Sequence, residues 1–328
     1  MWFIYALLAT VAWGCADLFY KKGADEQDRY SHLKTSVMVG VVMGIHAIVM
    51  LIILAANGTT YNFLNLLIYL PVSLMYILSM TVGYFGLRYL ELSVSSPIQN
   101  ASGVVSAIIM ILVLQQLPAP IEYIAIALIT AGVVLLGVFE KQKEDLYEAE
   151  NNKKYKIGFI AFFMPIAYCI IDSIGTALDG IYLDDFTKTP LVGVTEDNFE
   201  DVANISYELT FLIVAIALFI FIKFIKKEKF GIFEQKDRAG AAIFETAGQF
   251  AYVYAMSGNG VVAAPMIASY SFVSILLSRI FLKEKLSKKQ YLAVALVMLG
   301  IVILGVVEGL LEAETLPQWV ATLIGAEG

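Results

Sequence analysis

The chain has 328 residues, of which 59% are hydrophobic and only 16% are charged, and its formal net charge at pH 7 is −7. Soluble domains contain about 45–50% apolar residues even when glycine is included, so a water-soluble globule is excluded. The acidic balance leaves no basic face for DNA or RNA, and we therefore expect no nucleic-acid partner.

Ten stretches of the chain are long and apolar enough to cross a bilayer, which takes about 20 residues per helix. The first begins with Met1 and Trp2 and lacks the basic start of a signal peptide, so we expect it to be a retained helix. The predicted fold class is an all-α polytopic membrane protein with ten transmembrane helices. The predicted helices are 2–20, 36–56, 66–87, 95–114, 121–139, 157–178, 207–222, 239–256, 261–282 and 290–307.

Basic residues predict the orientation of these helices. The loops that follow the first, third, fifth, seventh and ninth helices, with the helix ends beside them, hold 21 of the 22 Lys and Arg residues, and only Lys188 lies on the other side. Positive residues near helix ends stay in the cytoplasm, so we expect these five loops to be cytoplasmic and both termini to be extracytoplasmic. The membrane we expect is the plasma membrane. The acidic stretch 179–206 is then a solvated extracytoplasmic loop. The amphipathic tail 308–328 either lies in the outer interface or packs loosely on the protein.

The two halves of the chain repeat each other. A shift of 168 residues places Gly132 on Gly300 and the segment 94–97 on 262–265, and a shift of 155 places 12–17 on 167–172. We therefore expect a first repeat over 1–140, a cytoplasmic linker over 141–156 and a second repeat over 157–307. Each repeat holds five helices, an odd number, so the second repeat enters the membrane from the opposite side. Inverted repeats of this kind are typical of alternating-access transporters.

Several motifs at the repeat ends resemble those of EamA-type proteins. Ala263-Ala264-Pro265, Phe281-Leu282-Lys283-Glu284-Lys285 and Leu299-Gly300 resemble the segments that close each repeat, and Trp13-Gly14 resembles the opening. The sequence departs from this pattern at Gln116, which stands where Glu284 stands in the second repeat. EamA-type proteins belong to the drug/metabolite transporter superfamily, and the resemblance covers residues 1–307. It implies a ten-helix transporter and not an enzyme.

Three acidic residues lie more than two residues from either end of a predicted helix, and an ionised side chain at a helix centre costs at least about 2.5–3.5 kcal/mol. Asp17 and Asp172 fall in opposite halves of the bilayer, and each is either a gating or coupling residue or a helix-end acid paired with a lysine such as Lys21. Glu245 shares a helix face with Gln249 and Tyr252. It either binds a cationic substrate or a proton, or makes a structural hydrogen bond.

Aromatic and amide side chains occur on the same helices as the three acids. Together they predict an aromatic, partly polar substrate pocket that suits ammonium groups, although tyrosines at helical spacing also pack between helices or at the membrane interface. The residues concerned are Trp13, Tyr76, Tyr84, Asn100, Tyr168 and Tyr270. The Gly40-x-x-x-Gly44 spacing beside His46 favours close helix contact, within the monomer or in a homodimer, and a proton relay at His46 is the alternative.

The sequence predicts a secondary-active transporter that moves a small polar metabolite by alternating access. The acids and aromatic residues favour a cationic, zwitterionic or neutral substrate, such as an amino acid or amine, with proton coupling as one option. A lipid flippase or a channel on the same fold is the alternative. His32 and His46 lack the spacing of a metallohydrolase, so we expect no catalytic site, metal or cofactor. The expected partners are the small-molecule substrate and membrane lipid.

Overall fold

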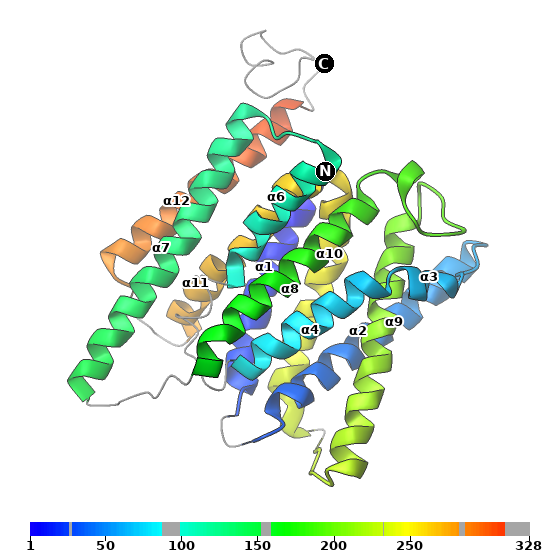
Figure 1. Cartoon of the computed structure of the whole chain (residues 1–328), viewed down its shortest axis with the longest axis horizontal. Helices are drawn as coiled ribbons and strands as arrows, with labels where there is room; N and C mark the ends of the chain where they lie inside the picture. Colours follow the sequence, from blue (N-terminus) through cyan, green and yellow to red (C-terminus); the bar gives the residue numbers. More distant parts are fainter. Residues whose placement is uncertain (26–27, 87–98, 152–158, 232, 282–285, 312–328) are drawn as a thin grey trace.

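The computed structural model describes residues 1–25, 28–86, 99–151, 159–231, 233–281 and 286–311. Within these ranges the chain is built from helices and contains no strand. The helices lie side by side in one bundle, with the N-terminus and the end of the last helix at the same end (Figure 1). We call this end the termini end. There, the Met1 ammonium group lies 2.6 Å from Glu308 Oε1.

The helices follow the apolar stretches of the sequence. They are α1 (Trp2–Gly23), α2 (Ser31–Ala56), α3 (Leu64–Ile68), α4 (Leu70–Gly86), α6 (Ser102–Leu114), α7 (Pro120–Asn151), α8 (Phe159–Leu183), α9 (Phe199–Ile220), α10 (Lys236–Ile267), α11 (Ser271–Phe281) and α12 (Lys288–Leu311). Each of the ten predicted segments contains helix. Seven regions of the described chain are long and apolar enough to cross a membrane, and two further apolar helices, Leu70–Phe85 and Ser102–Leu114, are shorter.

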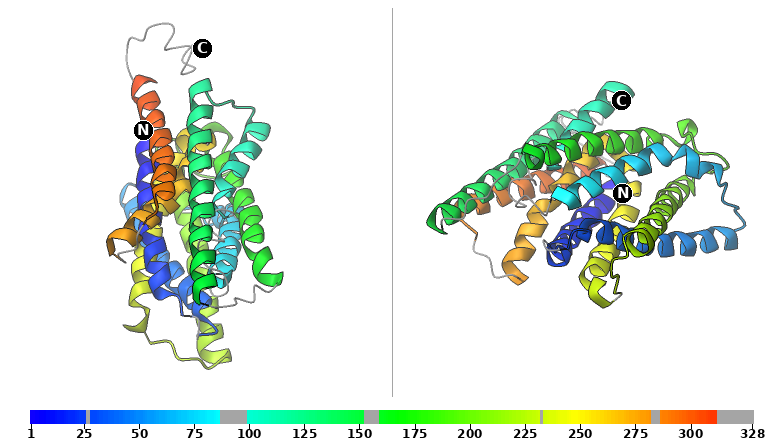
Figure 2. Two further views of the ribbon diagram at one scale, coloured as in Figure 1. Left: turned by 90° about the vertical axis from the view of Figure 1, so that its left-hand side faces the viewer. Right: turned by 60° about the horizontal axis from the view of Figure 1, so that its bottom comes forward.

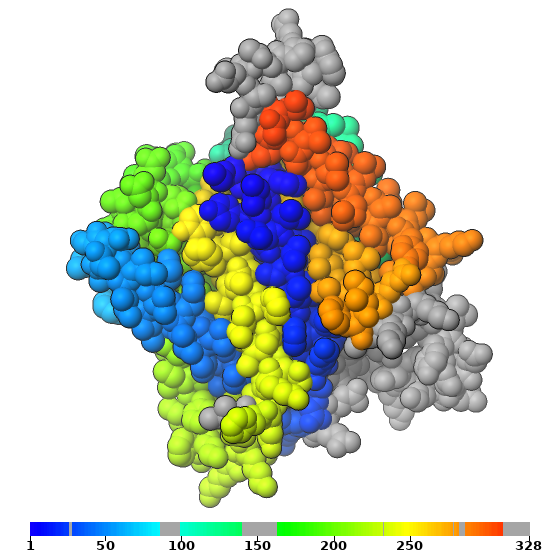
Figure 3. All heavy atoms as spheres, turned by 180° about the vertical axis from the view of Figure 1, so that it is seen from behind, coloured from blue at the N-terminus to red at the C-terminus, as the bar shows by residue number. Residues whose placement is uncertain are grey.

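One of the seven regions, Phe233–Phe281, contains two spans because the chain turns back at Asn259. The backbone of Asn259 is extended, with φ −164° and ψ 73°. Before the turn, a Cβ on Gly258 would lie 2.5 Å from Trp2 at the termini end. After it, Ser274 contacts Asp17 near the other end of α1. The part of α10 before Asn259 therefore runs along α1 toward the termini end, and the chain after Asn259 returns toward the opposite end. Figure 3 shows α1 between α10 and α11 on this face.

Corresponding helices of the two repeats make matching contacts. A Cβ on Gly132 of α7 would lie 2.8 Å from the Ala293 carbonyl oxygen of α12, and a Cβ on Gly300 of α12 would lie 2.8 Å from the Ala125 carbonyl oxygen of α7. All four residues correspond under the shift of 168. Figure 2 shows α7 and α12 side by side. The exchange of identical contacts is what two inverted five-helix repeats produce, and it confirms the fold class expected from the sequence.

Several predicted boundaries differ in the structure. The loop predicted over 179–206 is much shorter, because α8 continues to Leu183 and α9 already begins at Phe199. Part of the linker predicted over 141–156 is helical, since α7 extends to Asn151. Parts of several predicted segments lie outside the described residues. They are 152–158, which includes the rest of the linker, 87–98 with Arg88, 282–285, and the tail after residue 311.

Candidate functional site

A cavity of about 120 Å³ lies within the bundle, between α1, α4, α6, α8, α9 and α10. We call it the central cavity. All eleven residues predicted as substrate-binding, coupling or gating residues line it. They are Trp13, Asp17, Tyr76, Tyr84, Asn100, Tyr168, Asp172, Glu245, Gln249, Tyr252 and Tyr270. The structure thus brings together side chains from both repeats, and their role in binding stays a prediction.

The three predicted acids enter the central cavity from three different helices, and each accepts a hydrogen bond. The Ser274 hydroxyl donates to Asp17. Ser79 Oγ donates to Asp172 Oδ1 at 3.2 Å. Tyr20 donates to Glu245 Oε2 at 3.2 Å. The hydroxyl partners orient the three carboxyl groups, and none of these three hydrogen bonds comes from a basic side chain.

Trp13 forms part of the cavity wall through contacts that require a glycine. Its ring stacks on Tyr252 with the centroids 5.2 Å apart, and it meets the edge of Tyr270 at 6.2 Å. A Cβ on Gly248 would lie only 2.4 Å from Trp13 Cδ1. The indole therefore rests directly against the α10 backbone, where a larger residue has no room. On the opposite wall a Cβ on Gly83 would lie 3.0 Å from the ring of Tyr168.

Tyrosine hydroxyls connect the cavity walls toward the termini end. The Tyr76 and Tyr252 hydroxyl oxygens lie 2.6 Å apart, and Tyr76 also lies 2.9 Å from Thr176 Oγ1. Above them, the buried Tyr69 hydroxyl donates to the Asp179 carboxylate. Such a network holds α4, α8 and α10 together across the cavity.

Small residues and methionines close the bundle above this network. A Cβ on Gly180 of α8 would lie 2.2 Å from Met110 Sδ and 3.0 Å from Met256 Cε. A Cβ on Gly260 would lie 3.3 Å from the same Met110 Sδ. The helices that carry these residues are therefore in close contact at the termini end, with methionine side chains filling the space beside both glycines.

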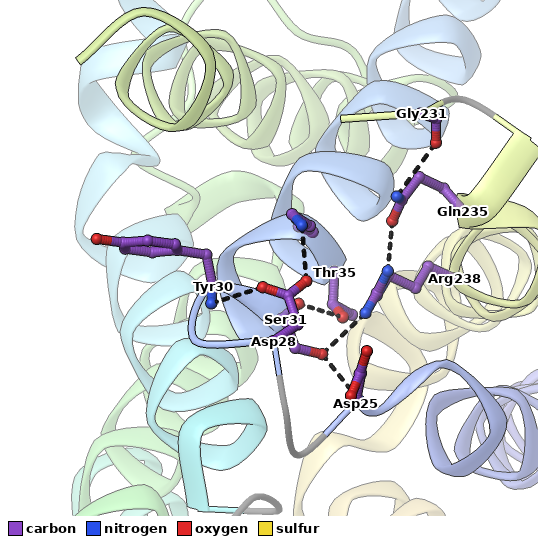
Figure 4. A network of polar contacts seen from close by, with 9 residues as sticks. Asp25, Asp28, Tyr30, Ser31, Thr35, Gly231, Gln235 and Arg238 are labelled. Carbon is purple, nitrogen blue, oxygen red and sulfur yellow. Dashed lines mark hydrogen bonds and ion pairs between the residues drawn. The ribbon is translucent and has the colours of Figure 1, made fainter. Parts of the chain in front are cut away.

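A polar network joins α2 and α10 at the end opposite the termini (Figure 4). Arg238 Nη2 donates to Ser31 Oγ at 2.8 Å and Nη1 donates to Gln235 at 2.5 Å. Lys34 Nζ donates a hydrogen bond to Asp28 Oδ2 at 2.7 Å. Partial burial raises the pKa of the Asp28 carboxyl, but the hydrogen bond from Lys34 helps to hold that pKa below its usual value. The network ties the first and second repeats at this end.

Sequence reasoning missed several buried polar residues. Tyr20 and Tyr207 line the central cavity, and Asp179 belongs to the network above it. Glu208 is fully buried and pairs with His46. Asp179 and Glu208 were missed because they stand at the two margins of the stretch predicted as a loop. The glycines beside His46 pack within the monomer, since a Cβ on Gly40 would lie 2.3 Å from the Phe211 carbonyl oxygen of α9.

Comparison with known proteins gives a family and a fold. The EamA-like transporter family matches residues 1–138 and 207–306, which together exceed half of the chain. A solved structure described as "Crystal structure of protein" is similar with a TM-score of 0.66 at 12% sequence identity, with 95% of this chain and 99% of that chain covered. At this identity the likeness concerns the fold alone. No curated protein matches the chain.

Proposed function

Because the chain belongs to the EamA-like transporter family, whose members are membrane transporters, we propose that its central cavity binds and moves a small cationic, zwitterionic or neutral metabolite. An amine or an amino acid has the required chemistry. The single observation that carries this proposal is the lining of the cavity. Three carboxylates face it, and no Lys, Arg or His side chain is among the described residues that line it.

The charge of the lining favours a cationic group. Carboxylates that share a low-dielectric cavity repel one another, and a cation between them lowers that cost. A phosphorylated or otherwise polyanionic substrate instead needs basic side chains at this depth. Trp13 and the tyrosines of the cavity add cation–π attraction for an ammonium group and stacking for a flat ring. A small molecule with one ammonium group and an apolar or aromatic body matches these features.

The two ends of the bundle support alternating access as the mechanism. The close contacts at Gly180 and Gly260 join helices at the termini end, and the Arg238 network joins the two repeats at the other end. We infer that transport breaks and remakes these two sets of contacts in turn. From the distribution of basic residues we infer that the termini end faces out of the cell.

Uptake into proteoliposomes tests this function. The probes are labelled tyramine, lysine and phenylalanine, with glucose 6-phosphate as the anionic comparison and protein-free liposomes as the blank. We expect saturable uptake of at least one of the first three, faster when the same compound is preloaded inside. Uptake without this acceleration indicates a channel, and movement of labelled lipid alone indicates a flippase. Saturable uptake of glucose 6-phosphate alone would contradict the proposed cargo.

A further inference from the structure

A pair of ionisable side chains, one of them fully buried, lies outside the central cavity, between α2 and α9. His46 Nδ1 is 2.8 Å from both carboxylate oxygens of Glu208. The Glu208 side chain is fully buried, whereas the His46 side chain is 29% exposed. At this distance one hydrogen lies between Nδ1 and the Glu208 carboxyl group, and it belongs to Nδ1 when the carboxyl group is ionised.

The pair lies near the middle of the membrane. Glu208 is nine residues after the start of α9 and His46 is ten residues before the end of α2, and both of these helix ends are at the termini end. At 1.5 Å per residue, both helices place the pair about 14–15 Å below that end. This is about half of a 30 Å hydrocarbon core, where an ionisable pair without a function is rare.

Polar side chains lead from the termini end to this pair along one face of α9. Asp201 accepts a hydrogen bond from the Tyr254 hydroxyl at 2.6 Å, and Glu200 accepts one from Ser257. Asn204 follows one turn further and one turn before Glu208. It is completely buried, and neither its amide nitrogen nor its amide oxygen has a hydrogen-bond partner among the described residues. Its free donor and acceptor are suited to a water molecule that passes a proton along.

We propose that the His46–Glu208 pair is a proton-binding site that couples transport to a proton gradient. The proposal rests on the proposed transport function and adds the coupling ion and its place. With one proton the pair is neutral overall. Release of the His46 proton to water leaves neutral imidazole and the Glu208 anion, a charge that is tolerated only when water reaches the pair. Proton release therefore requires the α2–α9 contact to open.

A proton fits this site better than a metal cation. Histidine nitrogen binds protons but is a poor ligand for sodium or potassium, and the 2.8 Å contacts leave no room for an ion between the two side chains. Other titratable groups around the pair are the Asp201 and Glu200 carboxyls on α9 and the Tyr254 hydroxyl on α10. The His46 ring also meets Phe250 edge-on at 5.4 Å, which shields it from the α10 side.

The site also has a structural link to the central cavity. Tyr207, the residue before Glu208, lines the cavity and meets Tyr76 at a centroid distance of 5.6 Å. A movement of α9 that wets Glu208 therefore displaces a cavity wall. This link is what coupling requires, because proton binding and substrate binding must favour different positions of the same helix.

Proton binding is tested without any substrate. The chain has two histidines, so nitrogen-15 histidine spectra of the full protein in liposomes contain the signals of only two imidazole rings, with two nitrogens each, and His46→Gln assigns them. We expect the His46 signal to titrate between about pH 5 and 9, and Glu208→Gln to move its midpoint by about one pH unit or more. A matched control is Glu122→Gln, which keeps an oxygen to accept from Ala119 N. A His46 signal that is constant over this range would overturn the proposal.

Coupling is tested with labelled tyramine in proteoliposomes. We expect Glu208→Gln and His46→Gln to lose accumulation driven by a pH difference at least tenfold, while tyramine exchange at equal pH stays within about twofold of wild type. Glu122→Gln should accumulate like wild type. If wild type exchanges tyramine but a pH difference drives no accumulation, the coupling proposal is wrong. If wild type does not exchange tyramine, the same comparison is made with whichever of lysine or phenylalanine it exchanges. If it exchanges none of the three, the proposed cargo fails, and the titration alone then decides whether the pair binds protons.

Discussion

The Trp13 indole lies against Gly248, and the contact leaves no space for even a methyl group between α1 and α10. A Cβ at Gly248 would approach Trp13 Cδ1 to 2.4 Å and Nε1 to 2.5 Å. Because the ring is also stacked on Tyr252, it moves only by leaving the cavity wall. The glycine therefore determines the shape of the central cavity.

This relationship predicts the effect of Gly248→Ala. We expect the substitution to displace Trp13 and to weaken tyramine binding at least tenfold, which corresponds to about 1.4 kcal/mol. Binding is measured by the shift in thermal unfolding with tyramine concentration. The matched control is Gly309→Ala on α12, where a Cβ meets nothing within 4 Å. Equal binding by the two variants would contradict this account of the cavity wall.

The α7–α12 contact leads to a prediction about stability. Gly132 and Gly300 occupy equivalent places, so alanine at either should separate the two helices by a similar amount. Overpacking by the added methyl group should lower the free energy of unfolding by about 1–3 kcal/mol. The better helix preference of alanine should offset about 0.5–1 kcal/mol of this loss. Thermal unfolding followed by circular dichroism should show both Tm values falling by a few degrees. A clear fall for one variant and none for the other would argue against equivalent contacts.

The sequence predicts the helices better than their ends. Length and hydropathy are enough to identify the ten spans, because each must cover the hydrocarbon core. The beginning of α9 was missed because Glu200 and Asp201 read as loop residues, although acids are favoured in the first turn of a helix. Because the predicted helix begins at residue 207, Glu208 falls at its edge, whereas in the structure Glu208 is the tenth residue of α9. Its burial was therefore not expected.

The content of the central cavity was predictable because acids and clustered aromatic residues are costly or unusual in apolar helices. Hydrogen-bond partners were not, since they depend on the packing of distant segments. Tyr20 and Glu245 are 225 residues apart in the chain and meet only when α1 packs on α10. Likewise, Asp179 was assigned to the loop, and only the fold places it beside Tyr69.

The acids of the central cavity should differ in importance. We expect Glu245→Gln to reduce tyramine affinity by about ten- to a hundredfold, the loss of one charge-assisted contact of about 1.5–3 kcal/mol. Asp17→Asn should have a smaller effect, because Ser274 remains within hydrogen-bond distance of its side chain. Binding is measured by thermal shift, with Gly309→Ala as the comparison. A larger loss for Asp17→Asn than for Glu245→Gln would reverse the assignment.

The orientation of the bundle is tested by thiol labelling in intact cells. The background carries Cys15→Ser and Cys169→Ser, which removes both native cysteines. Asp197 lies exposed before α9 at the termini end, and Lys227 lies exposed after α9 at the opposite end. Because basic residues remain in the cytoplasm, Asp197→Cys should react with an impermeant maleimide, whereas Lys227→Cys should react only after the membrane is opened. Labelling of Lys227→Cys in intact cells, with Asp197→Cys protected, would place the termini in the cytoplasm and leave the fold unchanged.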